Sequence, residues 1–208
     1  MHNYKGKFIT IEGLDGCGKG TQVEKLKELF KDREDIVFLR EPGGQVVSED
    51  IRTLILNPKY TDMDKMTEFL LFSASRAQLV SKVIIPLLED GKTIICERFT
   101  DSSVAYQGVA GGVDILDIMQ INKISTQGIE PDLTLLFMIS PEVTAKRMTE
   151  RDKDRLELKG LAFQSKVYEG YQLAAKMFAD RIVVINGDQS VEEVFEDVKE
   201  ALKNKDII

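Results

Sequence analysis

Phosphate-binding chemistry is concentrated in one glycine-rich stretch near the start of the chain, GLDGCGKGT at residues 13–21. The apolar run at 8–11 precedes it, and an amphipathic helical pattern follows it. A strand, a glycine-rich loop and a helix in this order form the context of a phosphate-binding P-loop. Glycines let backbone N–H groups converge on an anion, and the helix start adds its positive dipole end. We therefore expect the phosphates of a nucleotide to bind Gly13, Leu14, Asp15, Gly16, Cys17, Gly18, Lys19, Gly20 and Thr21.

The residue after Lys19 departs from the usual motif. A Ser or Thr there would provide a hydroxyl ligand for Mg²⁺, but this chain has Gly20 followed by Thr21. The metal must therefore use nucleotide oxygens, water, carboxylates or Thr21. The plain alternative is a glycine-rich turn without a ligand, and the flanking strand and helix patterns favour phosphate binding.

A second distinctive stretch, ERFTDSSVAYQG, covers residues 97–108 and follows an apolar run at 93–96. Glu97 stands where a carboxylate ligand of Mg²⁺ or of its water is expected after a buried strand. Arg98 follows at the strand end, and its fork-shaped side chain suits bidentate phosphate binding. Gln107 offers a donor and an acceptor that suit a nucleobase edge.

Three further side chains, Arg52, Phe72 and Arg76, are weaker candidates for ligand binding. Phe72 and Arg76 are four residues apart in a helical pattern and so share a face, where they could grip a planar base. From spacing alone we favour an ordinary core Phe beside a solvated Arg. Arg52 taken alone is typical of a surface arginine.

The elements that must position these residues alternate along the chain. Continuous apolar runs, rather than alternating ones, predict strands that are covered on both faces, as in a parallel sheet flanked by helices. Ligands of such sheets bind at the carboxyl ends of the strands, where the residues above are found. The expected strands are 8–11, 36–39, 93–96, 133–139 and 182–185, and the expected helices are 21–30, 49–56, 65–88, 115–127, 141–151, 161–178 and 191–202.

Composition narrows the class of protein. The 208 residues, 43% of them hydrophobic and 30% charged, suffice for one domain. The net charge of −7 argues against non-specific binding to nucleic acid or membranes. Two cysteines indicate no disulfide framework, and we find neither a signal peptide nor an apolar run long enough to span a bilayer. We expect a cytoplasmic protein without histidine catalysis, since His2 is the only histidine.

Across nearly its whole length the chain resembles the thymidylate kinase family. The resemblance rests on the P-loop stretch at 8–21, on REPGG at 40–44, LFSASR at 71–76, the stretch 97–108, PDL at 131–133, and DRLE at 154–157 followed by Phe163, Val167 and Tyr171. The REPGG and 97–108 motifs are highly specific, whereas a P-loop alone is not.

The resemblance implies an α/β P-loop nucleoside monophosphate kinase fold, with a five-stranded parallel sheet flanked by helices. It implies one domain over residues 1–208 with a lid at about 147–160. The activity would be transfer of the γ-phosphoryl group of ATP to dTMP with Mg²⁺, giving dTDP. A homodimer is typical, and the apolar parts of 65–88 and 115–127 could form its interface. No nucleic acid or membrane partner is implied.

The resemblance also assigns roles to matching residues. Asp15 would approach the dTMP sugar and phosphate and, with Glu97, the metal, directly or through water. Phe72 would stack on thymine, which replaces our spacing-based interpretation, and Tyr106 would lie under the deoxyribose. Arg52 and Arg98 would bind the acceptor phosphate. The remaining substrate-binding positions, around the base and sugar, are Glu41, Pro42, Arg76, Ser103 and Gln107.

The P-loop of this chain lacks one catalytic arginine that occurs in part of the family. Some family members carry an arginine beside the P-loop acid, but here that position is Gly16. The lid would then supply the cation, and our first choice is Arg155 because it matches the DRLE element. We expect Lys19, Asp15, Arg98, Arg155 and Arg151 to be the catalytic set, and the other lid candidates are Arg147 and Lys153.

Three other functions stay open at this point. The Gly20-Thr21-Gln22 run slightly favours an adenylate kinase or another nucleotide kinase. The NKIS run at 122–125 superficially resembles a guanine-reading motif of GTPases, but it lacks the Asp and falls in a helical pattern. A relative that binds dTMP without activity would be supported only by Gly20.

Overall fold

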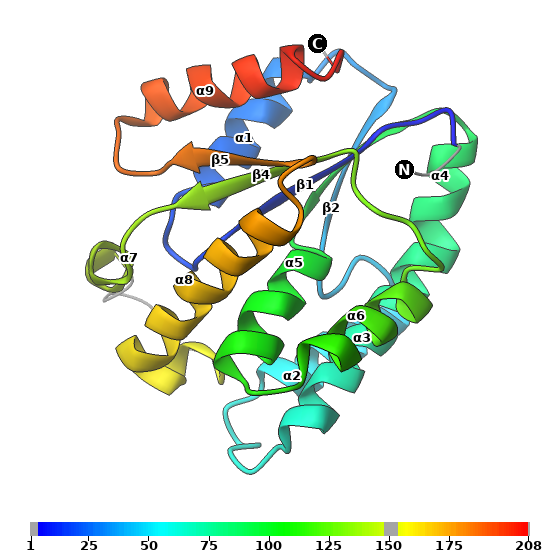
Figure 1. Cartoon of the computed structure of the whole chain (residues 1–208). Helices are drawn as coiled ribbons and strands as arrows, with labels where there is room; N and C mark the ends of the chain where they lie inside the picture. The colour runs from blue at the N-terminus through cyan, green and yellow to red at the C-terminus, as the bar shows by residue number, and fades with distance from the viewer. Residues whose placement is uncertain (1–3, 148–153, 208) are drawn as a thin grey trace.

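A five-stranded parallel sheet is the centre of the computed structural model, which describes residues 4–147 and 154–207 (Figure 1). Its strand order is β2-β3-β1-β4-β5, and every neighbouring pair is parallel. All five expected strands and the α/β class are confirmed. The strands are β1 (Phe8–Gly13), β2 (Ile36–Arg40), β3 (Thr93–Glu97), β4 (Leu133–Met138) and β5 (Ile182–Asn186).

The helices agree with the sequence patterns except after β3. Residues 100–110 are helical there, although serine, threonine and glycine have low helix propensity; tertiary packing overrides local preference. The α-helices are α1 (Lys19–Leu29), α2 (Val46–Leu56), α3 (Lys65–Leu79), α4 (Ile85–Glu89), α5 (Thr100–Ser103), α6 (Ile115–Ser125), α7 (Pro141–Arg147), α8 (Gly160–Met177) and α9 (Val191–Lys203). Two π-helical segments, η1 (Val80–Ile84) and η2 (Val104–Ala110), and the 3₁₀ turn η3 (Glu157–Lys159) complete the described elements.

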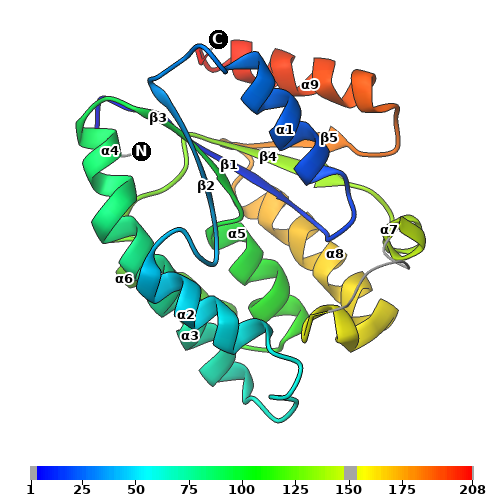
Figure 2. The same cartoon turned by 180° about the vertical axis from the view of Figure 1, so that it is seen from behind.

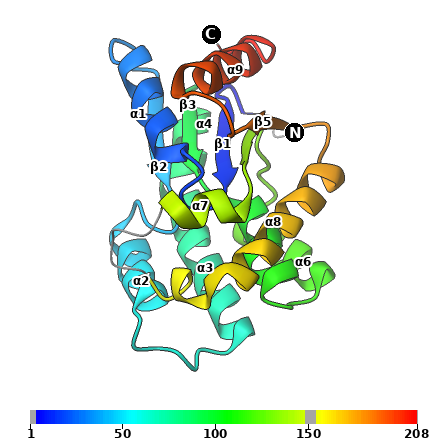
Figure 3. The ribbon, with the colours of Figure 1, turned by 90° about the vertical axis from the view of Figure 1, so that its left-hand side faces the viewer.

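Helices cover both faces of the sheet. Helices α1 and α9 lie on one face, while α5 and α8 lie on the other (Figures 1 and 2). A second group, α2, α3 and α6, packs together farther from the sheet. Figure 3 looks onto the carboxyl edge of the strands, and α7 lies across this edge. The arrangement leaves that edge to be shaped by loops, as the parallel topology predicts.

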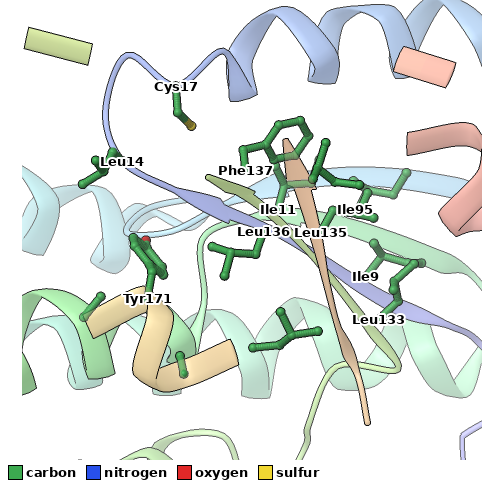
Figure 4. Close-up of a cluster of buried hydrophobic side chains, with 14 of the residues drawn as sticks. Ile9, Ile11, Leu14, Cys17, Ile95, Leu133, Leu135, Leu136, Phe137 and Tyr171 are labelled. Atoms are coloured by element: carbon green, nitrogen blue, oxygen red, sulfur yellow. The ribbon is translucent and has the colours of Figure 1, made fainter. Parts of the chain in front are cut away.

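The core explains why the strand sequences are continuously apolar. Every residue of β1 is buried, and Ile9 and Ile11 lie opposite Leu133 and Leu135 of β4. Leu136 is also buried, because helices cover both faces (Figure 4). Two-sided burial removes the polar alternation that a half-exposed strand would show.

The continuous helical segment α3-η1-α4, Lys65–Glu89, bears on the expectation that no apolar run could span a bilayer. By length and composition alone it could cross a membrane, although Arg76 and Lys82 interrupt its apolar residues. Phe69, Leu79, Val80 and Ile84 are fully buried in the protein core. Arg76, in the same segment, is buried in an ion pair. These contacts place one face of the segment in the protein core, while other side chains such as Leu70 stay exposed.

Candidate functional site

The P-loop joins β1 to α1 at the carboxyl edge of the sheet. Gly13 has a φ of 140°, and a Cβ there would lie 2.5 Å from the carbonyl oxygen of Phe137. Gly18, with a φ of 100°, directly precedes α1. Lys19 Nζ donates to the carbonyl oxygens of Gly13 at 3.0 Å and Leu14 at 2.7 Å. The loop has the strand, turn and helix that the motif requires, and its lysine is held inside it.

A cavity opens over this loop and is lined by seven of the nine residues predicted to bind phosphate, Asp15 to Thr21, whereas the predicted Gly13 and Leu14 do not line it. Glu97 and Arg147 also line it, from the end of β3 and from α7. The remaining wall comes from Gln22 of α1, from Gly187 and Gln189 in the β5–α9 connection, and from Val191 and Val194 of α9. None of these was among the predicted site residues. We call it the donor cavity.

A second cavity, the acceptor cavity, brings together every predicted substrate-binding residue. These residues come from five separate parts of the chain: Glu41, Pro42, Arg52, Phe72, Arg76, Arg98, Ser103, Tyr106 and Gln107. The structure adds lining residues that our sequence reasoning missed, namely Leu56, Phe99, Ser102, Asp154 and Leu156. Asp154 and Leu156 belong to the DRLE motif, so the sequence could have marked them as site residues. Leu56 belongs to no motif, and nothing in the sequence was a reason to choose it.

Asp15 is the one described residue that lines both cavities. Its carboxylate accepts hydrogen bonds from Arg98 Nη2 at 2.6 Å and from the Tyr106 hydroxyl at 3.0 Å. Burial would raise the pKa of Asp15, but the charges of Arg98 and Lys19 and these hydrogen bonds hold it well below its usual value. A carboxylate that is ionised at neutral pH therefore stands where the two cavities meet.

Arg98 is fixed by contacts from several elements. Its Nη1 donates to the Tyr171 hydroxyl at 2.9 Å and to the Gly13 carbonyl oxygen at 3.1 Å, and the guanidinium lies over the Tyr106 ring. Its φ of 68° is unusual for a residue other than glycine. Such a backbone persists where surrounding contacts determine it, and residues of this kind gather at functional sites.

Glu12, directly before the P-loop, was not predicted as a site residue. It is fully buried and accepts hydrogen bonds from Ser102 Oγ at 2.6 Å, Phe99 N at 2.7 Å and the Tyr171 hydroxyl at 3.0 Å. Burial and the nearby Asp101 charge raise its pKa to about 7. No motif marks Glu12, because its partners come from distant parts of the chain. It supports the same Tyr171 hydroxyl that Arg98 contacts.

Arg76 is not the solvated arginine that spacing alone suggested. It is 2% exposed, and its Nε donates to Glu41 Oε2 at 2.8 Å. Its Nη1 donates to Asn122 Oδ1 at 2.7 Å and to Ser103 Oγ at 3.0 Å. Asn122 lies inside α6 rather than after a strand, so the resemblance to a guanine-reading motif has no structural support.

Arg52 also departs from the surface arginine that we expected from its pattern alone. It projects from α2 into the acceptor cavity, and its Nη1 donates to the Pro42 carbonyl oxygen at 2.9 Å. Pro42 follows a cis peptide bond and itself lines the cavity. Arg52 and Arg98 thus bring two guanidinium groups to one cavity.

The structure does not place Arg155 at either cavity, in contrast to its choice as the lid cation. Its side chain is 6% exposed and forms an ion pair with Glu68 Oε2 at 2.7 Å. Its Nε donates to the Ile55 carbonyl oxygen at 2.7 Å. A buried guanidinium needs such partners, and they hold it against α2 and α3. Of the other candidates, Arg147 lines the donor cavity, while Arg151 and Lys153 lie outside the described residues.

The donor cavity has oxygen ligands that fit Mg²⁺. The carboxylates of Asp15 and Glu97 and the hydroxyl-bearing Thr21 line it, whereas Gly20 has no hydroxyl to contribute. Within residues 4–147 and 154–207 no cluster of three or more His, Cys, Asp or Glu side chains forms a metal cage. Mg²⁺ commonly uses only one or two carboxylates, with water and substrate phosphates completing its shell. The residues present suit this mode.

A model of the family described as thymidylate kinase matches residues 11–198. The chain belongs to the thymidylate kinase family. The chain is 45% identical over 195 residues to the thymidylate kinase of Geobacillus sp. (strain WCH70), covering 92% of this chain and 93% of that protein. It is 46% identical over 203 residues to that of Clostridium novyi (strain NT), covering 96% and 99%.

A solved structure agrees with this assignment. The crystal structure of thymidylate kinase from Ehrlichia chaffeensis superposes with a TM-score of 0.79 and 31% identity, covering 95% of this chain and 98% of that one. The fold expectation, a P-loop nucleoside monophosphate kinase, is therefore confirmed. Membership of the thymidylate kinase family identifies the enzyme as a dTMP kinase that uses ATP as co-substrate. It also decides against the adenylate kinase and GTPase alternatives and against a binding protein without activity.

Proposed function

We propose that the donor cavity holds ATP and the acceptor cavity holds dTMP, so that the reacting phosphates meet beside Asp15. The observation that carries this assignment is that Asp15 lines both cavities. Phosphoryl transfer requires mainly positioned phosphates and charges where negative charge develops. Lys19 and the loop N–H groups bind the donor phosphates, and no general base is needed because the acceptor phosphate is already anionic.

The acceptor cavity supports a role for each of its polar side chains. Arg98 and Arg52 bind the dTMP phosphate, since guanidinium groups match phosphate geometry. Phe72 is half-buried in the wall and stacks on the base, while Tyr106 lies under the deoxyribose. The base edge meets the polar side chains of Arg76, Ser103 and Gln107, and Glu41 and Pro42 complete the pocket.

Mg²⁺ would be held by Asp15 and Glu97, directly or through water, with Thr21 as a further oxygen ligand. When bound, it neutralises phosphate charge. In our proposal the lid cation is Arg147 and not Arg155, because Arg147 lines the donor cavity. The unit is one domain over residues 1–208 with a lid at about 147–160, and Arg151 stays a predicted catalytic residue of that lid.

An acceptor panel tests the cavity assignment. ADP release is measured with ATP and Mg²⁺ and with dTMP, dUMP, dCMP, AMP, CMP or GMP, for the native enzyme and for Phe72→Ala. We expect the native enzyme to prefer dTMP, and Phe72→Ala to raise KM for dTMP more than KM for ATP. A Phe72→Ala enzyme with unchanged KM for dTMP would overturn the placement of the base.

We also propose a homodimer and a cytoplasmic location. Exposed apolar side chains on the α2, α3 and α6 group support the dimer: Val46 and Val47 on α2, Leu70 on α3, and Leu116 and Ile124 on α6. Two buried free cysteines, Cys17 and Cys96, suit a reducing compartment.

A further inference from the structure

Glu68 of α3 joins three parts of the structure through one buried carboxylate. It is 3% exposed, and its Oε1 accepts a hydrogen bond from Gln107 Nε2 at 3.1 Å. Its Oε2 pairs with Arg155 Nη1 at 2.7 Å and with Lys159 Nζ at 3.1 Å. Glu68 does not itself line the acceptor cavity, whereas Gln107 does. The carboxylate thus contacts a residue that faces the substrate.

The charge of Glu68 dictates which way the Gln107 amide points. Burial would raise the pKa of Glu68, but Lys159, Gln107 and Arg155 outweigh burial and lower it. The ionised carboxylate can only accept hydrogen bonds, so Gln107 must turn its NH₂ group toward Glu68. The amide oxygen, Oε1, is left facing away from Glu68. Among the described residues, the donation from Nε2 to Glu68 is the side-chain hydrogen bond that Gln107 makes.

Arg76 complements this oxygen in the same cavity. A guanidinium carries five N–H groups. Four of them are used, by Glu41, Ser103, Asn122 and the Phe99 carbonyl oxygen. Within the described structure one N–H on Nη2 therefore remains for a ligand. Arg76 and Gln107 both line the acceptor cavity, so this N–H and the Gln107 amide oxygen are the donor and the acceptor that they can offer a base.

These two groups match one kind of pyrimidine edge. Thymine and uracil present a donor at N3–H and an acceptor at O4, whereas cytosine presents an acceptor at N3 and a donor at its 4-amino group. An acceptor on Gln107 and a donor on Arg76 therefore suit thymine and uracil and oppose cytosine. A site whose buried polar groups stay unpaired with the wrong ligand discriminates strongly against it.

We propose that Glu68 is a positioning residue for base specificity: it fixes the Gln107 amide with Oε1 toward the base, so that rings carrying N3–H are selected. The proposal rests on the assignment of the acceptor cavity to the nucleobase. It gives Glu68 no contact with the substrate, since it acts through Gln107.

The test is the ratio of kcat/KM for dUMP to that for dCMP, two substrates that both lack the thymine methyl group. In Glu68→Gln a neutral amide replaces the carboxylate and can donate as well as accept, so the Gln107 amide can turn over. We expect this ratio to fall at least about tenfold. Lys159→Arg is the matched control, because it changes a Glu68 partner but keeps a positive charge beside the carboxylate and leaves the Gln107 contact in place; its ratio should equal that of the native enzyme.

A ratio unchanged in Glu68→Gln, including one where both kcat/KM values fall equally, overturns the proposal and leaves Glu68 with a structural role only. Should Glu68→Gln fail to fold, Gln107→Leu keeps the Glu68 ion pairs and removes the acceptor. Its ratio must also fall about tenfold, and an unchanged ratio overturns the proposal. Failure of the cavity assignment looks different, because the native enzyme itself would then fail to prefer dUMP over dCMP.

Discussion

Arg98 is held in place before any substrate binds. Its left-handed backbone, its ion pair with Asp15 and its contact with Tyr171 all restrict one side chain. A group held in this way loses little conformational freedom when it binds phosphate. The geometry also explains why lysine would be a poor substitute, because one ammonium cannot reproduce the fork.

We predict that Arg98→Lys lowers kcat/KM for dTMP by about 10²-fold or more, with a much smaller change in KM for ATP. The matched control is Arg33→Lys, which changes an exposed arginine paired with Asp35 and should behave like the native enzyme. Steady-state kinetics with each substrate varied in turn provides the measurement. Native-like kcat/KM in Arg98→Lys would exclude fork-shaped phosphate binding by this residue.

Glu12 makes stability depend on pH. Its pKa is about 7 in the folded protein against 4.5 for the unperturbed group. Between these values the folded state keeps a proton that the unfolded state releases, so the free energy of unfolding falls as pH rises. The contribution of Glu12 to the free energy of unfolding is fully present below pH 4.5 and is lost as the pH rises toward 7. Above pH 7 the loss is complete.

We predict that the free energy of unfolding falls between pH 5 and pH 7.5, and that it falls by on the order of 1–3 kcal/mol more in the native enzyme than in Glu12→Gln. Urea unfolding of both proteins at several pH values measures this difference. The variant is the control, because its amide does not titrate and all other groups are kept. Parallel curves for the two proteins would contradict the raised pKa.

Gly20 marks a position where the chain can accept a larger residue. A Cβ at Gly20 has no neighbour within 4 Å, and the backbone there is helical. We predict that Gly20→Thr folds normally and lowers the Mg²⁺ concentration for half-maximal activity severalfold, since it adds an oxygen ligand to the donor cavity. The measurement is activity against Mg²⁺ at fixed ATP.

Gly18→Ala is the contrasting variant at the same loop. It also meets no neighbour, but the φ of 100° at Gly18 opposes any side chain. Its activity should fall while that of Gly20→Thr is retained. Equal damage by both substitutions would mean that the loop tolerates no Cβ at either glycine.

At the scale of elements, Arg155 and Lys159, in the later part of the predicted lid, are anchored by α2 and α3, while Arg147 of α7 faces the donor cavity. Arg155 bonds to α2 and α3, and Lys159 bonds to α3, so both residues are fixed beside the acceptor cavity. Helix α7 ends at Arg147, at the donor side. The two arginines should therefore have different functions.

We predict that Arg147→Ala lowers kcat by about 10²-fold with little change in thermal stability, because an exposed cation that acts on the transition state contributes little to folding. Arg155→Ala should instead lower the free energy of unfolding by about 1–3 kcal/mol, since the buried Glu68 carboxylate then keeps only Lys159 as an ion-pair partner. Each variant is the control for the other when both kcat and the melting temperature are measured. The reverse pattern would restore Arg155 as the lid cation.

At the scale of the whole molecule, the group of α2, α3 and α6 leaves apolar side chains uncovered. Leu116 and Ile124 are 71% and 76% exposed, and they stand eight residues apart, on one side of α6. Side chains of this size and exposure on packed neighbouring helices are typical of an interaction surface.

We predict that the native enzyme is a dimer and that Leu116→Glu with Ile124→Glu makes it a monomer, because the interface would bury two unpaired charges. Light scattering coupled to size-exclusion chromatography measures the mass. Val184→Glu is the control, since it places a charge at an exposed apolar position of β5, away from this group, and should leave the dimer intact. A native mass of one chain would disprove the dimer.

Much of the fold and of the site follows from local patterns. The five strands follow from continuous apolar runs, and the P-loop follows from glycine spacing after a strand. All nine substrate-binding residues that resemblance suggested line one cavity. Strand-end position was informative for Arg98, because parallel topology sends every strand end to the same edge.

Other features depended on contacts between distant residues. Arg155 pairs with Glu68, 87 positions earlier by residue number, and this pairing removes it from the donor cavity. Arg76 is buried by partners that range from Glu41, directly after β2, to Asn122 of α6, so the spacing-based interpretation of it as solvated was wrong. The helix at 100–110 formed against its own propensities.

The sequence by itself determined the strand pattern, the phosphate loop and the family, because each depends on residues that are neighbours in the chain or on short motifs. Only the tertiary structure decided the partners of Glu12, Glu68, Arg76 and Arg155. The free energy of a buried charge depends on which opposite charges and hydrogen-bond donors surround it, and long-range folding brings those groups together.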